Sequence, residues 1–132
     1  MLQFFRQGIP SLRSLKSKYR IGVISNSPSY PEVNINHFKH LELDQFIDHY
    51  IFSYSLTIAK PQTAIFKKAT ELFVTDPEQC VMIGDSLVAD IEGAQKLKMK
   101  TIWLNSKGES SSLPITPDFE IKLLSELSSA LL

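Results

Sequence analysis

Cysteine is nearly missing from this sequence of 132 residues. Cys80 is the only one, so no disulfide can form within the chain and no zinc site made of several cysteines is available. We therefore expect a chain from a reducing compartment, the cytoplasm. The chain also lacks a net charge, because its 14 Lys and Arg residues balance its 14 Asp and Glu residues. This balance gives no electrostatic reason to expect nucleic acid or a membrane surface as a partner.

Long hydrophobic runs are also missing. No apolar stretch approaches the ~20 residues that span a bilayer, and the start of the chain lacks the basic region and apolar core of a signal peptide. Apolar residues make up 43% of the chain and charged residues 21%. This composition is typical of a globular protein and excludes a disordered chain or a coiled coil. The length suits one domain, which we expect to cover residues 1–132.

Short apolar runs alternate with amphipathic stretches along the chain. The runs have the form of strands buried on both faces, at residues 20–25, 50–53, 80–83 and 101–104, with a short edge strand at 119–121. Helical spacing predicts helices at residues 11–18, 33–41, 62–73, 87–97 and 122–131, one helical turn at 75–78 and a surface loop at 105–118. This alternation favours a parallel sheet with helices on both faces.

Polar side chains follow three of the predicted strands. Ser25 ends the first strand and Asn26 follows it directly, Lys60 comes shortly after the second strand, and Asp85 and Asp90 follow the third. Ligands bind outside the carboxyl ends of parallel strands, so we expect these side chains to meet at one edge of the sheet. Carboxylates ligate Mg²⁺, a hydroxyl donates a hydrogen bond to phosphate oxygens, and a lysine neutralises the charge that develops on the transferring phosphoryl group. The set therefore predicts phosphoryl chemistry.

Each of these features also has a simpler interpretation. A Ser-Asn pair after a strand is commonly a turn or a helix cap, and a Lys-Pro pair is commonly a solvated loop that enters a helix. An aspartate after a strand often caps only the next helix. The functional interpretation depends on their joint occurrence at three consecutive strand ends, which is much rarer than any single motif.

The same segments resemble the motifs of the haloacid dehalogenase (HAD) superfamily, which consists mostly of Mg²⁺-dependent phosphatases. Residues 21–26, Ile-Gly-Val-Ile-Ser-Asn, resemble its second motif. Residues 59–66, with Lys60 and Pro61, resemble the third, and residues 81–90 resemble the fourth. The likeness continues at residues 93–94 and 99–104 and so covers nearly the whole chain.

The resemblance implies a fold and a role for each motif residue. The fold would be a three-layer α/β/α, Rossmann-like core with a mostly parallel sheet. Ser25 would be a catalytic residue that binds the phosphoryl group of a small phosphorylated metabolite, Asn26 would contact this substrate, and Lys60 would contact it and stabilise charge. Asp85 would ligate Mg²⁺, and Asp90 would ligate it or hold one of its waters. The family often has glycine where Lys98 stands, closing a helix in a left-handed conformation, so we expect about 1 kcal/mol of strain there.

The first motif of the family, D-x-D-x-[TV], is missing from this chain. Its first aspartate is the nucleophile that forms an aspartyl-phosphate, and its second is the general acid and base. No aspartate here has that spacing after an apolar strand. The cap that usually follows this motif is missing as well, and we interpret residues 1–9 as its remnant. The substrate is therefore not readable, and dehalogenase, phosphonatase and mutase chemistry stay open for a parent protein.

The missing motif also removes a strand. In the family that strand is central, between the strands that end here at Ser25 and Ile83. Its loss would leave two interior strands with unpaired backbone groups, and exposed strand edges recruit other chains. Three arrangements would close the gap: direct pairing of the two strands, docking of a second copy, or a strand from a separate N-terminal piece. A truncated gene product is a further explanation.

Two main functions follow. The first is a phosphatase-type hydrolase core, inactive or crippled as this chain because the nucleophile is missing. The alternative is a non-enzymatic remnant or subunit that binds Mg²⁺, phosphate or a partner protein. A response-regulator receiver is a weaker third hypothesis. Receivers carry their acceptor aspartate on a middle strand and have acidic residues near the start of the domain, and this chain does not match that pattern. His37, His40 and Asp44 have metal-ligand spacing, but a solvated helix face is the favoured interpretation.

Overall fold

The computed structural model describes residues 10–131, so our interpretation of residues 1–9 lies outside the described part. The five strands are β1 (Gly22–Ser25), β2 (His49–Phe52), β3 (Val81–Gly84), β4 (Lys100–Leu104) and β5 (Phe119–Ile121). The helices are a helix at 10–16, α2 (Pro31–His40), α3 (Thr63–Phe73), a π-helix (Leu87–Glu92), α4 (Gly93–Gln95) and α5 (Leu127–Leu131). Single 3-10 turns cover Asp44–Phe46, Ser53–Ser55, Pro77–Gln79 and Leu124–Glu126. All five predicted strands are present, shifted by at most two residues at their ends.

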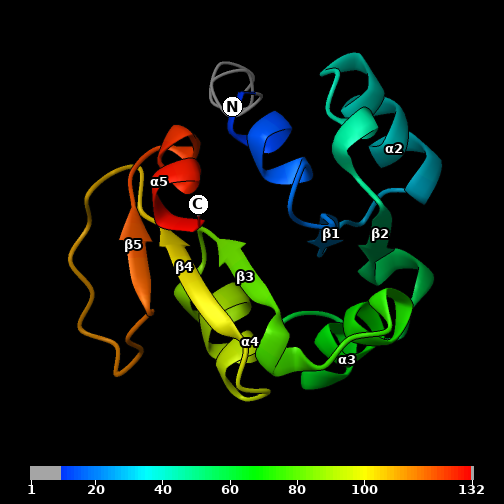
Figure 1. The fold of residues 1–132 in the computed structure, drawn as a ribbon. Helices are drawn as coiled ribbons and strands as arrows, with labels where there is room; N and C mark the ends of the chain where they lie inside the picture. Colours follow the sequence, from blue (N-terminus) through cyan, green and yellow to red (C-terminus); the bar gives the residue numbers. More distant parts are fainter. Residues whose placement is uncertain (1–9, 132) are drawn as a thin grey trace.

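The strands form two separate parallel sheets (Figure 1). One sheet holds β1 and β2, with Val23 opposite Tyr50. The other has the order β3-β4-β5, with Ile83 opposite Ile102. All pairings are parallel, as predicted. β1 and β3 do not pair with each other, so direct pairing, one of the three arrangements considered for closing the gap, is wrong.

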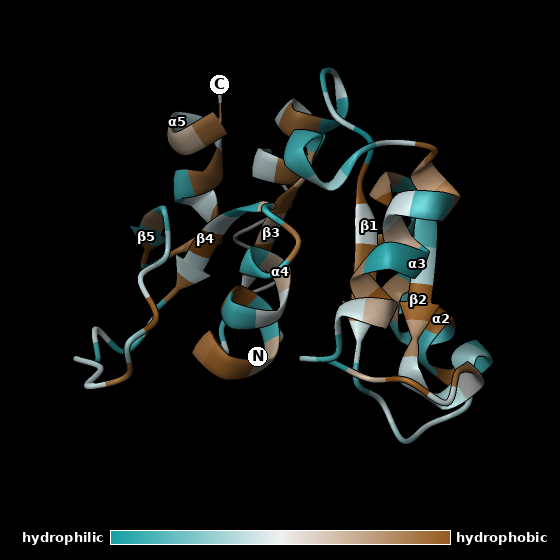
Figure 2. Ribbon diagram, turned by 90° about the horizontal axis from the view of Figure 1, so that it is seen from below, coloured by the Kyte–Doolittle hydropathy of each residue, from teal (hydrophilic) through white to brown (hydrophobic). Residues whose placement is uncertain are grey.

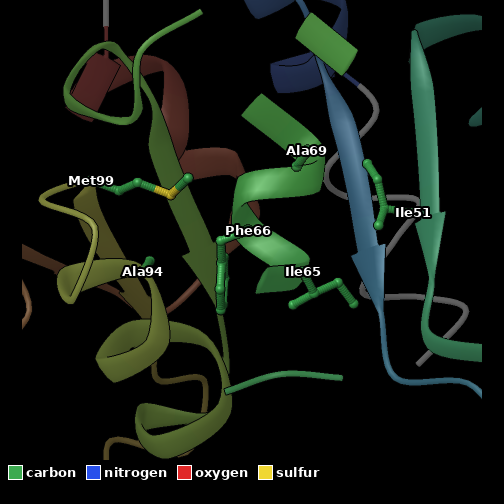
Figure 3. Close-up of a cluster of buried hydrophobic side chains, with 6 residues drawn as sticks. All are labelled: Ile51, Ile65, Phe66, Ala69, Ala94 and Met99. Atoms are coloured by element: carbon green, nitrogen blue, oxygen red, sulfur yellow. The ribbon is translucent and has the colours of Figure 1, made fainter. Parts of the chain in front are cut away.

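Helices cover both faces of this split strand layer. On one face, Phe66 of α3 and Ala94 of α4 are fully buried in a core against which Ile24 of β1 and Met82 of β3 pack (Figure 3). The other core lies on the opposite face. It contains Leu15 of the helix at 10–16, Ile102 of β4 and Leu127 of α5, with Ile21, Val81 and Ile83 packed against it. The predicted three-layer α/β/α arrangement is confirmed.

Three predicted helices differ from the expectation in their type or in where they begin. Residues 87–92 are a π-helix rather than an α-helix, because the N–H groups of both Asp90 and Ile91 donate to the carbonyl of Ser86. The last helix begins late, because the carboxylate of Glu126 accepts the N–H groups of residues 122 and 123 and leaves Leu123 extended. α3 begins at residue 63, and Pro61 therefore precedes the helix.

Three helices are followed within three residues by a left-handed residue that is not glycine, and Glu42, with φ 60°, is the one that follows α2. Lys98 has φ 63°, so the strain expected there is present, and Val74 at the end of α3 has φ 51°. Within residues 10–131, no helix has the length and apolar content needed to cross a membrane.

Candidate functional site

The end of β1 holds the backbone that leads into α3. Asn26, the first residue after β1, donates from its side-chain Nδ2 to the carbonyl of Lys60 at 2.9 Å. Its Oδ1 accepts the N–H of the same lysine at 2.8 Å. Asn26 therefore satisfies both backbone groups of Lys60 and fixes the point from which the lysine side chain leaves the chain.

The lysine side chain then reaches the residues that follow β3. Its Nζ lies 2.5 Å from Oδ1 of Asp90, and the two side chains are only 12% and 4% exposed. The other carboxylate oxygen of Asp90 accepts the N–H of Ser86 at 3.0 Å. Because little water reaches this pair, its attraction is screened far less than that of a surface ion pair. Asn26, Lys60 and Asp90 thus connect the ends of the two sheets.

The other two predicted site residues lie beside this cluster. Ser25 is half-buried at the last position of β1, and Asp85 is exposed directly after β3. The indole N–H of Trp103 donates to the carbonyl of Asp85 at 3.1 Å and so holds its backbone against β4. The structure therefore joins three of the five predicted residues by direct contacts and places the remaining two at the same ends of β1 and β3.

Sequence reasoning missed three supporting contacts. The hydroxyl of Ser86 accepts the N–H of Ala89 and caps the π-helix that carries Asp90. The side chain of Asn34 in α2 donates to Ser27 at 2.9 Å, which ties the loop after β1 to the following helix. The third is the Trp103 bond. A serine at the cap position is readable in principle, whereas the other two contacts join separate elements and leave no local signal.

Comparison with known proteins agrees with this geometry. The family model for haloacid dehalogenase-like hydrolases matches residues 1–104. The chain belongs to this family. Over 92 residues it is 39% identical to glyceraldehyde 3-phosphate phosphatase of Pyrococcus furiosus. Two solved structures share the fold: 2-haloacid dehalogenase of Pseudomonas syringae, with a TM-score of 0.84 and 30% identity, and the putative HAD-hydrolase YfnB of Bacillus subtilis bound to magnesium, with 0.85 and 25%.

These HAD relatives are longer than the chain. The match covers 70% of this chain but 38% of the Pyrococcus protein. It covers 95% of this chain and 51% of the Pseudomonas one, and 93% of this chain and 54% of the Bacillus one. The chain therefore spans about half the length or less of these relatives. Their activities differ by name, so membership of the HAD family does not by itself select a reaction.

Two carboxylates of this chain could ligate Mg²⁺, the ion that the HAD resemblance implies. Asp85 and Asp90 offer the hard carboxylate oxygens that this ion prefers. One oxygen of Asp90 is already bound to Lys60, and the other to the N–H of Ser86. Across the part of the chain that the structure describes, no three His, Cys, Asp or Glu residues gather to hold an ion on their own. The two carboxylates therefore fit Mg²⁺ in chemistry but supply only some of its ligands.

The second candidate cluster does not assemble. His37 and His40 are exposed on α2, which buries none of its residues. The carboxylate of Asp44 instead accepts the hydroxyl of Tyr50 at 2.6 Å. Burial raises the pKa of Tyr50, and its hydrogen bond to the Asp44 carboxylate raises it further. The solvated helix face is therefore the better description of these histidines.

Proposed function

We propose that this chain supplies the phosphate-binding and Mg²⁺-binding half of a phosphatase that acts on a small phosphorylated substrate. The observation that carries the proposal is the position of Lys60, which Asn26 anchors at the end of β1 and which reaches Asp90 after β3. A buried ammonium and carboxylate at the carboxyl ends of parallel strands match the charge pattern of phosphoryl transfer. The name of the Pyrococcus relative, a phosphatase of glyceraldehyde 3-phosphate, supports the same reaction and a small substrate.

We assign each side chain one task. The hydroxyl of Ser25 donates to a phosphate oxygen, and Lys60 neutralises charge that develops on the transferring group. Asn26 positions Lys60 first, and the second N–H of its amide is available to the phosphate. Asp85 and Asp90 would hold Mg²⁺, which when bound supplies further charge neutralisation.

The nucleophile has to come from outside residues 1–132. A carboxylate would attack phosphorus, and the bond from phosphorus to the substrate oxygen would break. The general acid of the same missing motif would give its proton to that oxygen, which would leave as an alcohol. Water would then release phosphate from the acyl phosphate. Because the chain has no D-x-D motif, we propose that it is inactive or strongly impaired alone, with only weak electrostatic catalysis left.

Hydrolysis of p-nitrophenyl phosphate by the purified chain, with and without Mg²⁺, tests this proposal. We expect no turnover above background while circular dichroism shows a folded chain. The Asp85→Asn variant controls for a contaminating phosphatase, which would remain active in both preparations. Mg²⁺-dependent turnover that the variant loses would show that a residue of this chain replaces the nucleophile.

The second candidate, a non-enzymatic binder, is favoured by the missing nucleophile. Calorimetric titration with Mg²⁺ and inorganic phosphate separates it from a half-enzyme. Phosphate binding that Lys60→Met abolishes would favour the binder if no phosphatase activity appears when a polypeptide with a D-x-D motif is added to the chain. No binding at all would contradict both functions.

A further inference from the structure

Asp85 lies in a short link between two regular elements. β3 ends at Gly84 and the π-helix begins at Leu87, so the link consists of Asp85 and Ser86. Ser86 is fixed at the helix end, because its N–H donates to the carboxylate of Asp90 and its carbonyl accepts the N–H of that residue. Asp85 is exposed, so a cation can reach its carboxylate from solvent. The position of this carboxylate depends on what holds the backbone of Asp85 itself.

Trp103 holds that backbone from a rigid part of the molecule. Its indole N–H donates to the carbonyl of Asp85 at 3.1 Å. Figure 2 shows β4, the strand of Trp103, between β3 and β5, and its neighbours Ile102 and Leu104 are buried. In the register of the sheet Trp103 stands opposite Gly84, the residue before Asp85. A strand that is paired on both sides thus anchors the backbone that carries the exposed carboxylate.

Glycine at residue 84 gives this anchor its importance. Gly84 leaves room for the side chain of Asp90, and glycine is also the residue whose backbone is least restricted. The chain immediately before Asp85 therefore gains no stiffness from a side chain of its own. The indole bond supplies this stiffness, because it fixes the carbonyl of Asp85 and with it the Cα from which the carboxylate side chain extends.

The indole bond affects cation binding only if it changes how often the link has the geometry that binds. When a binding-competent conformation is populated in part, the measured Kd rises in inverse proportion to its population. One net hydrogen bond changes such a population about two- to tenfold. The coupling is reciprocal, so a bound cation has to stabilise the indole bond by the same factor.

We propose that Trp103 is a positioning residue for divalent cation binding, and that it acts through its indole N–H on the backbone of Asp85. The cation is Mg²⁺, for which Asp85 and Asp90 supply hard carboxylate oxygens. Trp103 is not itself a ligand, because an indole nitrogen is a donor only. The inference rests on the Mg²⁺-binding part of the proposed function, and it is independent of the nucleophile and of the substrate.

A purely structural role for Trp103 predicts a different result. The indole bond would then form equally well with and without the cation. Its loss would lower the free energy of unfolding and leave the affinity for Mg²⁺ unchanged. Cation affinity and stability are therefore the two quantities to compare in each variant.

NMR of the intact chain measures the coupling directly. Trp103 is the only tryptophan, so its indole N–H gives a single signal. Mg²⁺ is added in steps, with sodium chloride keeping the ionic strength constant, and the shifts of the Ser86 and Leu87 amides give the Kd. We expect Mg²⁺ to slow hydrogen exchange of the indole N–H about two- to tenfold. In Asp85→Asn, which keeps the carbonyl but loses the charged ligand, Mg²⁺ should leave this exchange unchanged.

Replacement of Trp103 by benzothienylalanine removes the donor alone, because sulfur takes the place of the N–H in a ring system of the same shape. With a single tryptophan in the chain, the replacement alters no other residue. We expect the Kd for Mg²⁺ to rise about two- to tenfold, and Trp103→Phe should raise it as well. Urea unfolding checks that both chains are folded.

Tyr19→Phe is the matched control. It also removes one side-chain donor to a backbone carbonyl, since the hydroxyl of Tyr19 donates to the carbonyl of Leu131 at 2.9 Å. Tyr19 precedes β1 and so lies at the amino ends of the strands, opposite the candidate site. The variant should bind Mg²⁺ with the same Kd as the unchanged chain.

The possible results have distinct meanings. Weaker Mg²⁺ binding in the benzothienylalanine chain, together with slower indole exchange in Mg²⁺, would support the proposal. An unchanged Kd in that chain would overturn it and leave the proposed function intact, because the cation site would not depend on the indole N–H. Equal weakening in Tyr19→Phe would overturn it too. No saturable binding of Mg²⁺ by the unchanged chain would contradict both the inference and the Mg²⁺-binding part of the proposed function.

Discussion

The carboxylate of Asp90 occupies the space that a side chain on Gly84 would need. A Cβ placed on Gly84 would lie 2.3 Å from Oδ2 and 2.4 Å from both Cβ and Cγ of Asp90. These distances are far inside van der Waals contact, and the clash includes Cβ, which a rotation of the carboxylate cannot move. Asp90 can therefore contact Lys60 only because residue 84, at the end of β3, is a glycine.

Gly84→Ala should accordingly displace Asp90 and loosen its ion pair with Lys60. We expect a loss of about 1–3 kcal/mol in the free energy of unfolding, measured with urea, as for other overpacked sites. A double-mutant cycle with Asp90→Gly is the control, because removing the opposing side chain should make Gly84→Ala nearly neutral. A full, additive loss in the double variant would contradict the direct clash.

The buried pair of Lys60 and Asp90 should matter more than the surface pair of Lys16 and Asp48. Lys60→Met leaves a nearly buried carboxylate without its partner, and we expect a loss of about 3 kcal/mol. Lys16→Met breaks a pair whose side chains are each about a third exposed, and it should cost less than about 1 kcal/mol. Equal losses of unfolding free energy for the two variants would show that Asp90 contacts water or a new partner when Lys60 is removed.

Val74 is held in a left-handed conformation although its side chain is 89% exposed and adds little packing. A β-branched residue there carries about 1–2 kcal/mol of strain. Val74→Asn should therefore raise the free energy of unfolding by about 1 kcal/mol, and Lys98→Gly should raise it by a similar amount. Glu71→Gly, at an exposed position inside α3, is the matched control and should lower it by about 1 kcal/mol. No gain from either change would mean that the ends of these helices relax in solution.

Asp48 should contribute to stability in a pH-dependent way. Burial is the largest single effect on its pKa and raises it, but the hydrogen bonds from Lys16 and from the N–H of Ile21, together with the charge of Lys16, outweigh burial and lower the pKa below 3.8. Because the pKa is lower in the folded state, the stabilisation is present above pH 3.8 and is lost as the pH falls through the folded-state pKa.

We therefore expect the difference in unfolding free energy between the chain and its Asp48→Asn variant to shrink as the solution is acidified below about pH 3.8. Urea unfolding across this range measures it. In Lys16→Met, NMR titration of the Asp48 carboxylate should show its pKa moving up toward the ordinary value. An unchanged pKa would contradict the role of the lysine.

The strands were predictable from sequence, and the helix ends were not. A doubly buried strand has to be a short apolar run, so Val81–Gly84 and Lys100–Leu104 stand out in the sequence. Helix ends and helix type depend instead on individual hydrogen bonds. Glu126 delays the last helix by binding two N–H groups, and the shared carbonyl of Ser86 makes a π-helix where apolar spacing indicated an α-helix.

The candidate site divides in a similar way. Ser25, Lys60, Asp85 and Asp90 were found because each ends or follows a strand, and parallel strands bring such positions to one edge. The role of Asn26 was not predictable in full. Sequence reasoning made it a substrate contact, whereas its amide binds the backbone of Lys60 in the structure. Local sequence carries no record of a contact between residues 34 positions apart.

The sequence alone determined the parallel α/β class, the residues available for phosphoryl chemistry, and the lack of a nucleophile motif, because periodicity and residue type are local properties. Only the tertiary structure decided that the strands divide into two sheets, that Lys60 bridges them, and that β1 and β3 do not pair. These features arise from packing between distant segments. Whether two strands pair depends on how the helices on both faces of the sheet pack against them, and no single segment of the sequence encodes this packing.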